Sequence, residues 1–206
     1  MKRRTRDSRA PSAWLHAAAA AFGLAALAAA QEPVAVAPQE IVEILHRALV
    51  AAASSADVDE RYRQLRPVVV ATHDLPYIAQ FALRRQWPML SATDRERFVA
   101  AFEQLSVMTY ASRFANVSEA TFSITGTADA GAGRTTVTAS IARDNDTPIP
   151  LEYLLHEADG RWRIINIVAD GVSDLALKRA EYQSALAQGS LDDLIARLEE
   201  QTARLR

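Results

Sequence analysis

The chain has 206 residues, no cysteine, and 23 basic against 25 acidic side chains. The absence of cysteine excludes disulfides, thiolate metal sites and cysteine nucleophiles, so an exported form must be stabilised by an apolar core. Five of the basic residues stand before Ala10, and the chain beyond residue 30 is acidic by about six charges, which argues against a phosphate-tracking surface for nucleic acid.

The first 30 residues have the features of a secretory signal peptide. A basic start precedes the apolar run Ala13–Ala30, whose last three residues are alanines at the positions that a signal peptidase reads. A retained membrane anchor is the alternative, although the run is at the short limit for crossing a bilayer. We expect residues 1–30 to be removed, residues 31–37 (QEPVAVA) to form a mobile N-terminus, and the remaining protein not to insert stably into a membrane.

Helical apolar spacing predominates in the first half of the remaining chain. Pro38 opens a helix that continues to about Ala53. A second helix begins at about Asp57, and Pro67 is expected to kink or end it. A third is capped by Asp74 and continues through Leu83, with inward-facing Tyr77, Ile78, Phe81 and Ala82.

The clearest helix is predicted from Asp94 to about Ala115, with Thr93 and Glu96 at capping-box spacing. Its inner face is a continuous stripe that ends in small polar residues: Phe98, Ala101, Phe102, Leu105, Met108, Thr109 and Ser112. Such a stripe is typical of core packing, and contact with a ligand is the alternative.

From Thr121 the apolar period changes to two. Four strands are predicted at Thr121–Thr127, Thr135–Ala142, Ile149–Glu157 and Arg161–Val168, with turns at Asp129–Gly133, Asp144–Asp146 and Asp159-Gly160. Short links predict an antiparallel meander, and apolar residues on both faces of the last two strands favour a curved sheet. Two helices follow, one capped by Ser173 or Asp174 and ending at Gly189, the other capped by Ser190 with Asp193.

No catalytic motif is visible. Beyond residue 30 the histidines are His46, His73 and His156, and their spacing does not match a metal site, so structural or surface roles are favoured. There is no phosphate loop and no nucleophile elbow. The acidic run Asp144–Asp146 lacks the glycine and closing glutamate of a calcium loop. We therefore predict no catalytic residue, no metal site and no cofactor.

Two features leave alternatives open. Asp170-Gly171, beside Trp162, could be an acid in a cleft or an ordinary turn before a helix cap. A group of arginines could bind an anionic headgroup or a partner, or could be a solvated face: Arg84, Arg85, Arg95, Arg97 and Arg113.

Several short pieces, taken in order, resemble the MlaC-like family, the toluene-tolerance auxiliary components of ABC-type lipid transport. They are Trp87 followed by Arg97-Phe98, Thr109-Tyr110-Ala111, Gly160–Ile164, Gly171-Val172-Ser173, Lys178-Arg179 with Tyr182, and Gly189 with Leu194-Ile195. Together they cover nearly the whole chain beyond the signal peptide. The segment Ser106–Phe114 is most similar to the branch associated with hopanoid biosynthesis. The chain departs from the family pattern at Arg84, at Pro88-Met89-Leu90 and at Asn166.

The resemblance implies helices packed on a curved antiparallel sheet, with a deep apolar pocket for acyl chains. Together with the order of elements, it predicts one α+β domain over residues 38–206. N-terminal helices would pack on a four-stranded sheet, two C-terminal helices would close the fold, and the pocket would lie between the layers. The expected pocket lining is Phe81, Phe98, Phe102, Leu105, Tyr110, Val137, Ile141, Leu151, Tyr153, Ile164 and Ile167.

These predictions favour a periplasmic carrier of phospholipid or hopanoid-type lipid, not an enzyme. Such a carrier would exchange its ligand with inner- and outer-membrane lipid transport complexes. It needs apolar volume rather than chemistry, because burying a lipid tail gains about 0.8 kcal/mol per methylene. Two alternatives stay open. One is a cone-shaped α+β enzyme with Asp170 or His156 as base, and the other is an envelope adaptor that binds through the Arg84 to Arg97 surface.

Overall fold

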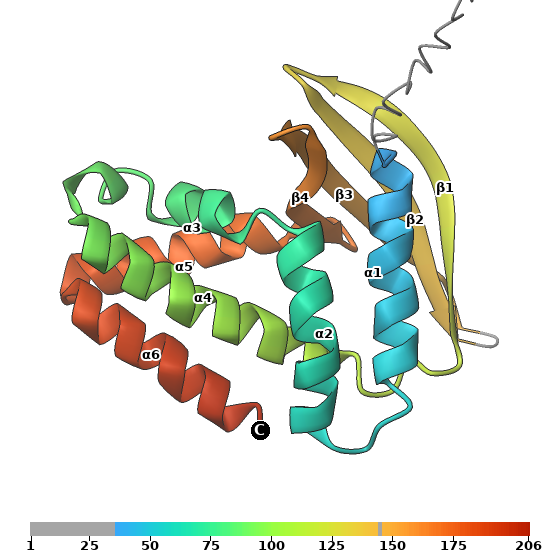
Figure 1. The fold of residues 1–206 in the computed structure, drawn as a ribbon, viewed down its shortest axis with the longest axis horizontal. Helices are drawn as coiled ribbons and strands as arrows, with labels where there is room; N and C mark the ends of the chain where they lie inside the picture. Colours follow the sequence, from blue (N-terminus) through green and yellow to red (C-terminus); the bar gives the residue numbers. More distant parts are fainter. Residues whose placement is uncertain (1–35, 144–145) are drawn as a thin grey trace, which may run out of the picture. The chain divides into compact units, whose positions relative to one another are not determined.

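The computed structural model describes residues 36–143 and 146–206 (Figure 1). The expected signal peptide, residues 31–35 of the expected N-terminal lead and two residues of the turn at 144–146 lie outside this part. The elements, in order, are α1 Pro38–Ala52, α2 Val58–Thr72, α3 Leu75–Leu83, the 3-10 turn η1 Trp87–Met89, α4 Ala92–Arg113, β1 Ala120–Gly131, β2 Arg134–Arg143, β3 Ile149–Ala158, β4 Arg161–Ala169, β5 Val172–Ser173, α5 Asp174–Gln188 and α6 Leu191–Arg204. None of the helices in these ranges is long and apolar enough to cross a membrane.

The strands form one antiparallel sheet in the order β1-β2-β3-β4-β5. The predicted α+β class and meander are confirmed, but the prediction of four strands is wrong by one. The two-residue β5 pairs with the end of β4 through Ala169 and Val168. It is joined to β4 by Asp170-Gly171, whose φ angles of 49° and 76° are the left-handed pair that tight hairpins require. The first turn is also tighter than predicted, because β1 continues to Gly131 and leaves Ala132-Gly133 as the loop.

The helices do not all cover the sheet. Helix α1 packs against β1, β2 and β4, and it lies along the curved sheet in Figure 1. Among the strands, helices α2 and α3 contact mainly β4. Helix α4 packs mainly on other helices, namely α2, α3 and α6. The prediction that the N-terminal helices all pack on the sheet is therefore corrected: α4 belongs mostly to a helical layer.

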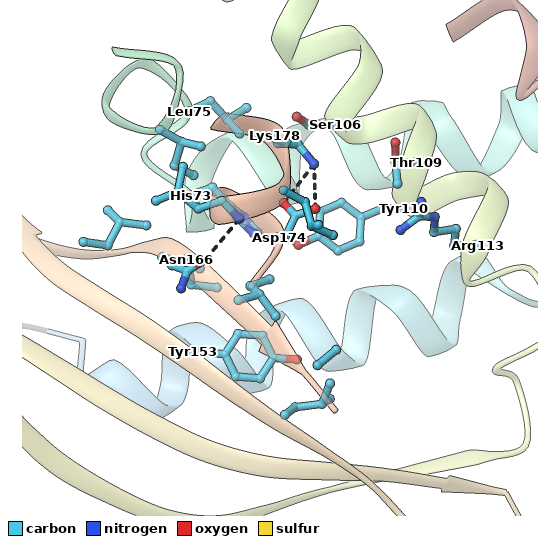
Figure 2. A pocket seen from close by; sticks show the side chains of 18 of the residues that line it. His73, Leu75, Ser106, Thr109, Tyr110, Arg113, Tyr153, Asn166, Asp174 and Lys178 are labelled. Carbon is cyan, nitrogen blue, oxygen red and sulfur yellow. Dashed lines mark hydrogen bonds and ion pairs between the residues drawn. The ribbon is translucent and has the colours of Figure 1, made fainter. Parts of the chain in front are cut away.

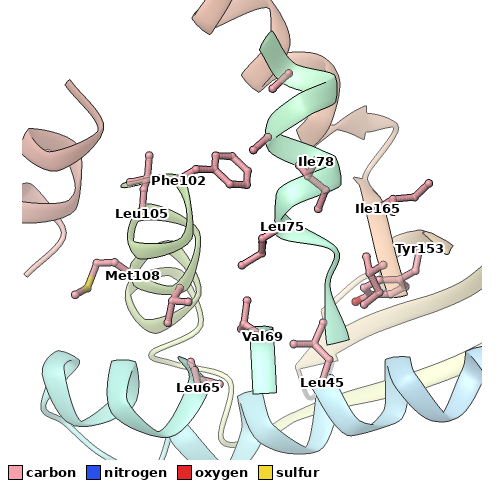
Figure 3. Close-up of a cluster of buried hydrophobic side chains, with 14 of the residues drawn as sticks. Leu45, Leu65, Val69, Leu75, Ile78, Phe102, Leu105, Met108, Tyr153 and Ile165 are labelled. Carbon is pink, nitrogen blue, oxygen red and sulfur yellow. The ribbon is translucent and has the colours of Figure 1, made fainter. Parts of the chain in front are cut away.

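The core lies where these helices meet the last two long strands. Figure 3 shows side chains from α1, α2, α3 and α4 directed toward one another and toward β3 and β4: Leu45, Leu65, Val69, Leu75, Ile78, Phe102, Leu105, Met108, Tyr153 and Ile165. All ten are buried. The join between α2 and α3 is fixed to the sheet, because the Asp74 backbone N–H donates to the Ile164 carbonyl at 3.0 Å.

Two local predictions about the helices are corrected. Of the two effects expected of Pro67, a kink or an end, the end is excluded, because α2 continues to Thr72. A proline removes only one backbone donor, and Leu65 and Val69 on either side of it are buried in the core. Helix α4 is capped by Ser91, whose Oγ accepts from the Asp94 N–H at 3.1 Å. Thr93 is already inside the helix, so it cannot adopt the extended backbone of a capping residue.

Candidate functional site

A cavity of about 340 Å³ lies between the inner face of β3 and β4 and helices α3, α4 and α5 (Figure 2). This volume is at the lower end of the range of roughly 300–1,000 Å³ that is usual for ligand pockets. Its wall is mostly apolar, with a few polar groups. The lining residues are Leu49, His73, Leu75, Ile78, Phe102, Ser106, Thr109, Tyr110, Arg113, Phe114, Leu151, Tyr153, Ile164, Ile165, Asn166, Ile167, Ala169, Val172, Asp174, Leu175, Leu177 and Lys178.

Helical spacing explains the contribution of α4. Phe102, Ser106, Thr109, Tyr110 and Arg113 lie three or four residues apart, or next to each other, along one side of the helix. Helix α5 adds Asp174 and Leu175 at its start, followed by Leu177 and Lys178.

Strand β4 contributes neighbouring residues that ordinary alternation would separate. Leu154 pairs with Asn166, whereas Leu155 pairs with Ile164, so Ile165 is an extra residue in β4. This β-bulge disturbs the alternation of side chains. As a result Ile164 and Ile165 are both buried and both line the cavity.

Two tyrosines of the cavity wall are tied to buried histidines. The Nε2 atom of His73 is 2.8 Å from the Tyr110 hydroxyl, and that of His46 is 2.9 Å from the Tyr153 hydroxyl. His73 Nδ1 is 3.1 Å from the Val69 carbonyl, an acceptor only. The proton of a neutral His73 is therefore on Nδ1, and Tyr110 donates to Nε2.

Burial keeps this part of the cavity uncharged at neutral pH. It lowers the pKa of His46 and of His73 to about 4, and it raises the pKa of Tyr110 and of Tyr153. Polar groups that bond to each other can be buried at little expense in free energy. The wall can therefore meet an acyl chain without leaving charges or unpaired tyrosine hydroxyls.

Comparison with protein families matches residues 39–200 to the family described as MlaC protein. The chain belongs to the MlaC family. Among solved structures, it is similar to the phospholipid-binding protein from Ralstonia solanacearum, determined in complex with a phospholipid, with a TM-score of 0.72 and 19% identity. The match covers 82% of this chain and 98% of that one, and at this identity it shows the fold. No curated protein matches the sequence.

Six of the eleven residues predicted to line the pocket of this MlaC protein do line the cavity: Phe102, Tyr110, Leu151, Tyr153, Ile164 and Ile167. Of the others, Phe98, Leu105 and Val137 are buried elsewhere in the core, and Ile141 is partly buried. Phe81 was expected to face inward but is 37% exposed, with the Arg84 guanidinium 5.9 Å from its ring. Contact of any of these residues with lipid stays a prediction.

The polar members of the wall were predicted only in part. Ser106 lies four residues after Phe102, so it could have been found by extending the stripe of α4 through its polar positions; Thr109 was part of that stripe, and Arg113 belonged to the arginine group with a possible headgroup role. Asn166, noted in the sequence only as a departure from the family pattern, has a structural role. Its Oδ1 accepts from Ser173 Oγ at 3.0 Å and from the Leu175 N–H at 3.3 Å, which ties the start of α5 to β4.

The bases proposed for an enzymatic alternative lie outside the cavity. Asp170 is an exposed turn residue whose N–H donates to the Pro150 carbonyl. His156 bonds to Asp74 at 2.9 Å in a separate surface depression beside Tyr77. The arginine group is also divided: Arg97 pairs with Asp192 at 2.7 Å, while Arg113 lines the cavity.

The buried histidines predict that this MlaC protein becomes less stable in mild acid. In the unfolded chain each histidine takes up a proton below pH 6.5, whereas in the folded protein the pKa is about 4. Their contribution is therefore complete above pH 6.5 and declines as the pH falls toward 4, by about 1.4 kcal/mol per pH unit for each histidine.

Urea unfolding between pH 7.5 and 4.5 measures this slope. Carboxylates also titrate there, so the comparison is with the double variant His46→Gln, His73→Gln. We expect that variant to be less stable at neutral pH but to have a distinctly shallower dependence on pH. An equal slope in both proteins would contradict the prediction.

Proposed function

We propose that this protein is a periplasmic carrier that binds a phospholipid, or a hopanoid-type lipid, by its apolar part in the cavity. The observation that carries the proposal is the apolar cavity between β3-β4 and helices α3 to α5, in a chain of the MlaC family. The similar Ralstonia solanacearum protein was solved with a phospholipid bound, which supports phospholipid as the ligand.

The free energy of tail burial is sufficient for such a ligand. Each methylene that leaves water contributes about 0.8 kcal/mol, so the burial of about ten methylenes contributes about 8 kcal/mol, which corresponds to micromolar affinity without a charged anchor. A volume of about 340 Å³ takes only part of a phospholipid, so the wall would have to yield for a whole acyl chain to enter. Leu177, which lines the cavity and is 58% exposed, is a wall residue that could move with little loss of packing.

The proposed cycle follows from the expected signal peptide and the family. Residues 1–30 would direct export and be removed, and the carrier would then exchange lipid with inner- and outer-membrane complexes of an ABC-type system. Burial of the tails makes spontaneous release slow. Release would therefore be driven by a partner that binds the lipid-free protein, or a form with a deformed cavity, more tightly than it binds the loaded protein.

Filling the cavity is expected to prevent lipid binding. Thr109 lies on the cavity side of α4 and is only partly buried, so Thr109→Trp places a large ring in the cavity while the fold tolerates it. Excluding even two methylenes costs about 1.6 kcal/mol, more than tenfold in affinity. Native mass spectrometry of purified protein and uptake of a fluorescent phospholipid from vesicles measure the effect.

The matched control is Gln104→Trp, which adds the same ring to an exposed position of α4 away from the cavity. It should take up lipid as the wild type does. Equal uptake by the two tryptophan variants would show that the lipid binds elsewhere. A wild-type protein that neither carries lipid nor takes it up from vesicles would overturn the proposed function itself.

A further inference from the structure

Several polar and charged side chains belong to the cavity wall on α4 and α5. They include Ser106 and Arg113 from α4, and Asp174 and Lys178 from α5. Lys178 Nζ donates to both carboxylate oxygens of Asp174, at 2.7 and 2.9 Å, and its side chain is only 17% exposed. Figure 2 shows the ammonium group of Lys178 directed toward the Asp174 carboxylate.

Ser106 is the unusual member of this group. It is 8% exposed, and its Oγ has no hydrogen-bond partner in the described part of the chain. Thr109, less than one turn further along α4, donates to the Leu105 carbonyl at 2.7 Å. Helix α4 thus offers a carbonyl partner to one hydroxyl and leaves the other unpaired. Buried hydroxyls in native proteins nearly always have a partner, so a ligand atom is the natural candidate at Ser106.

The charges of these side chains favour an anionic partner. The ammonium of Lys178 is offset by Asp174, whereas Arg113, an exposed residue of the wall, has no carboxylate within ion-pair distance in residues 36–143 and 146–206. The side chains Ser106, Lys178 and Arg113 are all hydrogen-bond donors, and one positive charge remains uncompensated. A phosphodiester supplies one negative charge and several acceptor oxygens, and charge-assisted bonds to it are strong.

We propose that Ser106, Lys178 and Arg113 form a subsite for the phosphodiester of the bound lipid, an inference that rests on the proposed function. The acyl chains fill the apolar part of the cavity, and the phosphate lies beside these three side chains. There it accepts hydrogen bonds from the Ser106 hydroxyl and from the Lys178 ammonium, which turns partly away from Asp174. Asp174 holds Lys178 in place while the cavity is empty. The protein therefore selects lipids with a phosphate next to the chains over uncharged lipids with the same chains.

The test compares two fluorescent lipids with identical acyl chains, phosphatidylglycerol and diacylglycerol, presented in neutral vesicles. Wild-type protein should load the phosphate-bearing lipid about tenfold or more in preference to the other, the magnitude expected for one charge-assisted hydrogen bond. Ser106→Ala and Lys178→Met should each lower phosphatidylglycerol loading severalfold more than diacylglycerol loading, and so reduce this preference. Arg179→Met removes a charge one residue further along, outside the cavity wall, and should keep the preference.

Equal loading of both lipids by the wild type would overturn the subsite. So would Ser106→Ala and Lys178→Met variants that lower the loading of both lipids alike. An effect of Arg179→Met as large as that of Lys178→Met would overturn it too. Loading of neither lipid would instead overturn the proposed function, so the two failures are distinguishable. Inorganic phosphate, added at millimolar concentration, separates two sources of the same anion. Competition against phosphatidylglycerol alone would make free phosphate a second ligand of the subsite, and the absence of competition would assign it to the lipid.

Discussion

Replacement of Tyr182 by alanine is expected to lower the free energy of unfolding by about 3–5 kcal/mol, the usual loss for a large buried aromatic ring. Tyr182 is 1% exposed. Its ring makes edge-to-face contacts with Phe98 and Phe102, at centroid distances of 5.8 and 6.3 Å. These contacts link α5 to α4, and the alanine leaves a void that neighbouring helices can only partly fill. Urea unfolding followed by circular dichroism measures the loss.

The matched variant for this position is Tyr182→Phe, which keeps the ring and removes the hydroxyl. The aromatic contacts remain and only one hydroxyl is lost, so we expect a change of about 1 kcal/mol or less. If phenylalanine were as damaging as alanine, the hydroxyl and not the aromatic contacts would be what stabilises α5. Because α5 carries Lys178 and Leu175, the alanine variant should also retain lipid less well at temperatures far below its unfolding transition.

Most predictions that depend on a few neighbouring residues succeeded, the capping box at Thr93 being an exception. Ser190 and Asp193 form the predicted capping box at the start of α6, and Asp74 caps α3 through the Tyr77 N–H. Asp159-Gly160 forms the predicted tight turn with φ angles of 52° and 70°. The same two-residue signature at Asp170-Gly171 would have predicted β5, but the sequence after it was interpreted only as a helix cap.

The faces of the strands were easier to predict than what covers them. Val137 pairs with Tyr153, and Tyr153 with Ile167, so alternation places all three on one face of the sheet. Helix α1 packs over β1 and β2, which makes Val137 core. Helix α1 also reaches Tyr153 through the His46 side chain, yet Tyr153 and Ile167 both line the cavity. The position of a helix 100 residues away in the chain decides this, and no local pattern records it.

The bulge in β4 has the same origin. A strict alternation through Ile164 and Ile165 would bury one of them and expose the other. Both are buried because the pairing with β3 shifts by one residue, and the fixed join of α2 and α3 lies against this point: the Asp74 N–H bonds to Ile164. The register of a strand against its neighbour and against a helix junction is a property of the packed fold.

Arg61→Met is the second variant with a large expected effect, a loss of about 3–5 kcal/mol in the free energy of unfolding. Arg61 is 7% exposed. Its Nε donates to the Ala111 carbonyl at 2.6 Å, and one terminal nitrogen donates to the carbonyls of Ser55 and Ala56 at 2.8 and 2.9 Å. Ala111 lies in the last turn of α4, where backbone carbonyls have no partner within the helix. Methionine fills much of the same space but leaves these carbonyls without their donor.

Two further substitutions test whether the effect comes from the planar donors of the Arg61 guanidinium rather than from its charge or from the general loss of an arginine in α2. Arg61→Lys keeps the charge, but one ammonium cannot reproduce the planar set of donors that reaches both the end of α4 and the loop after α1, so we expect an intermediate loss. Arg63→Met removes an exposed arginine two residues along the same helix, paired only with Glu60 on the surface, and should change stability little. An Arg61→Met protein as stable as Arg63→Met would show that the buried guanidinium does not hold α4 to the first two helices. Because α4 supplies the cavity stripe from Phe102 to Arg113, a genuine loss there should also weaken lipid retention in proportion to the stability lost.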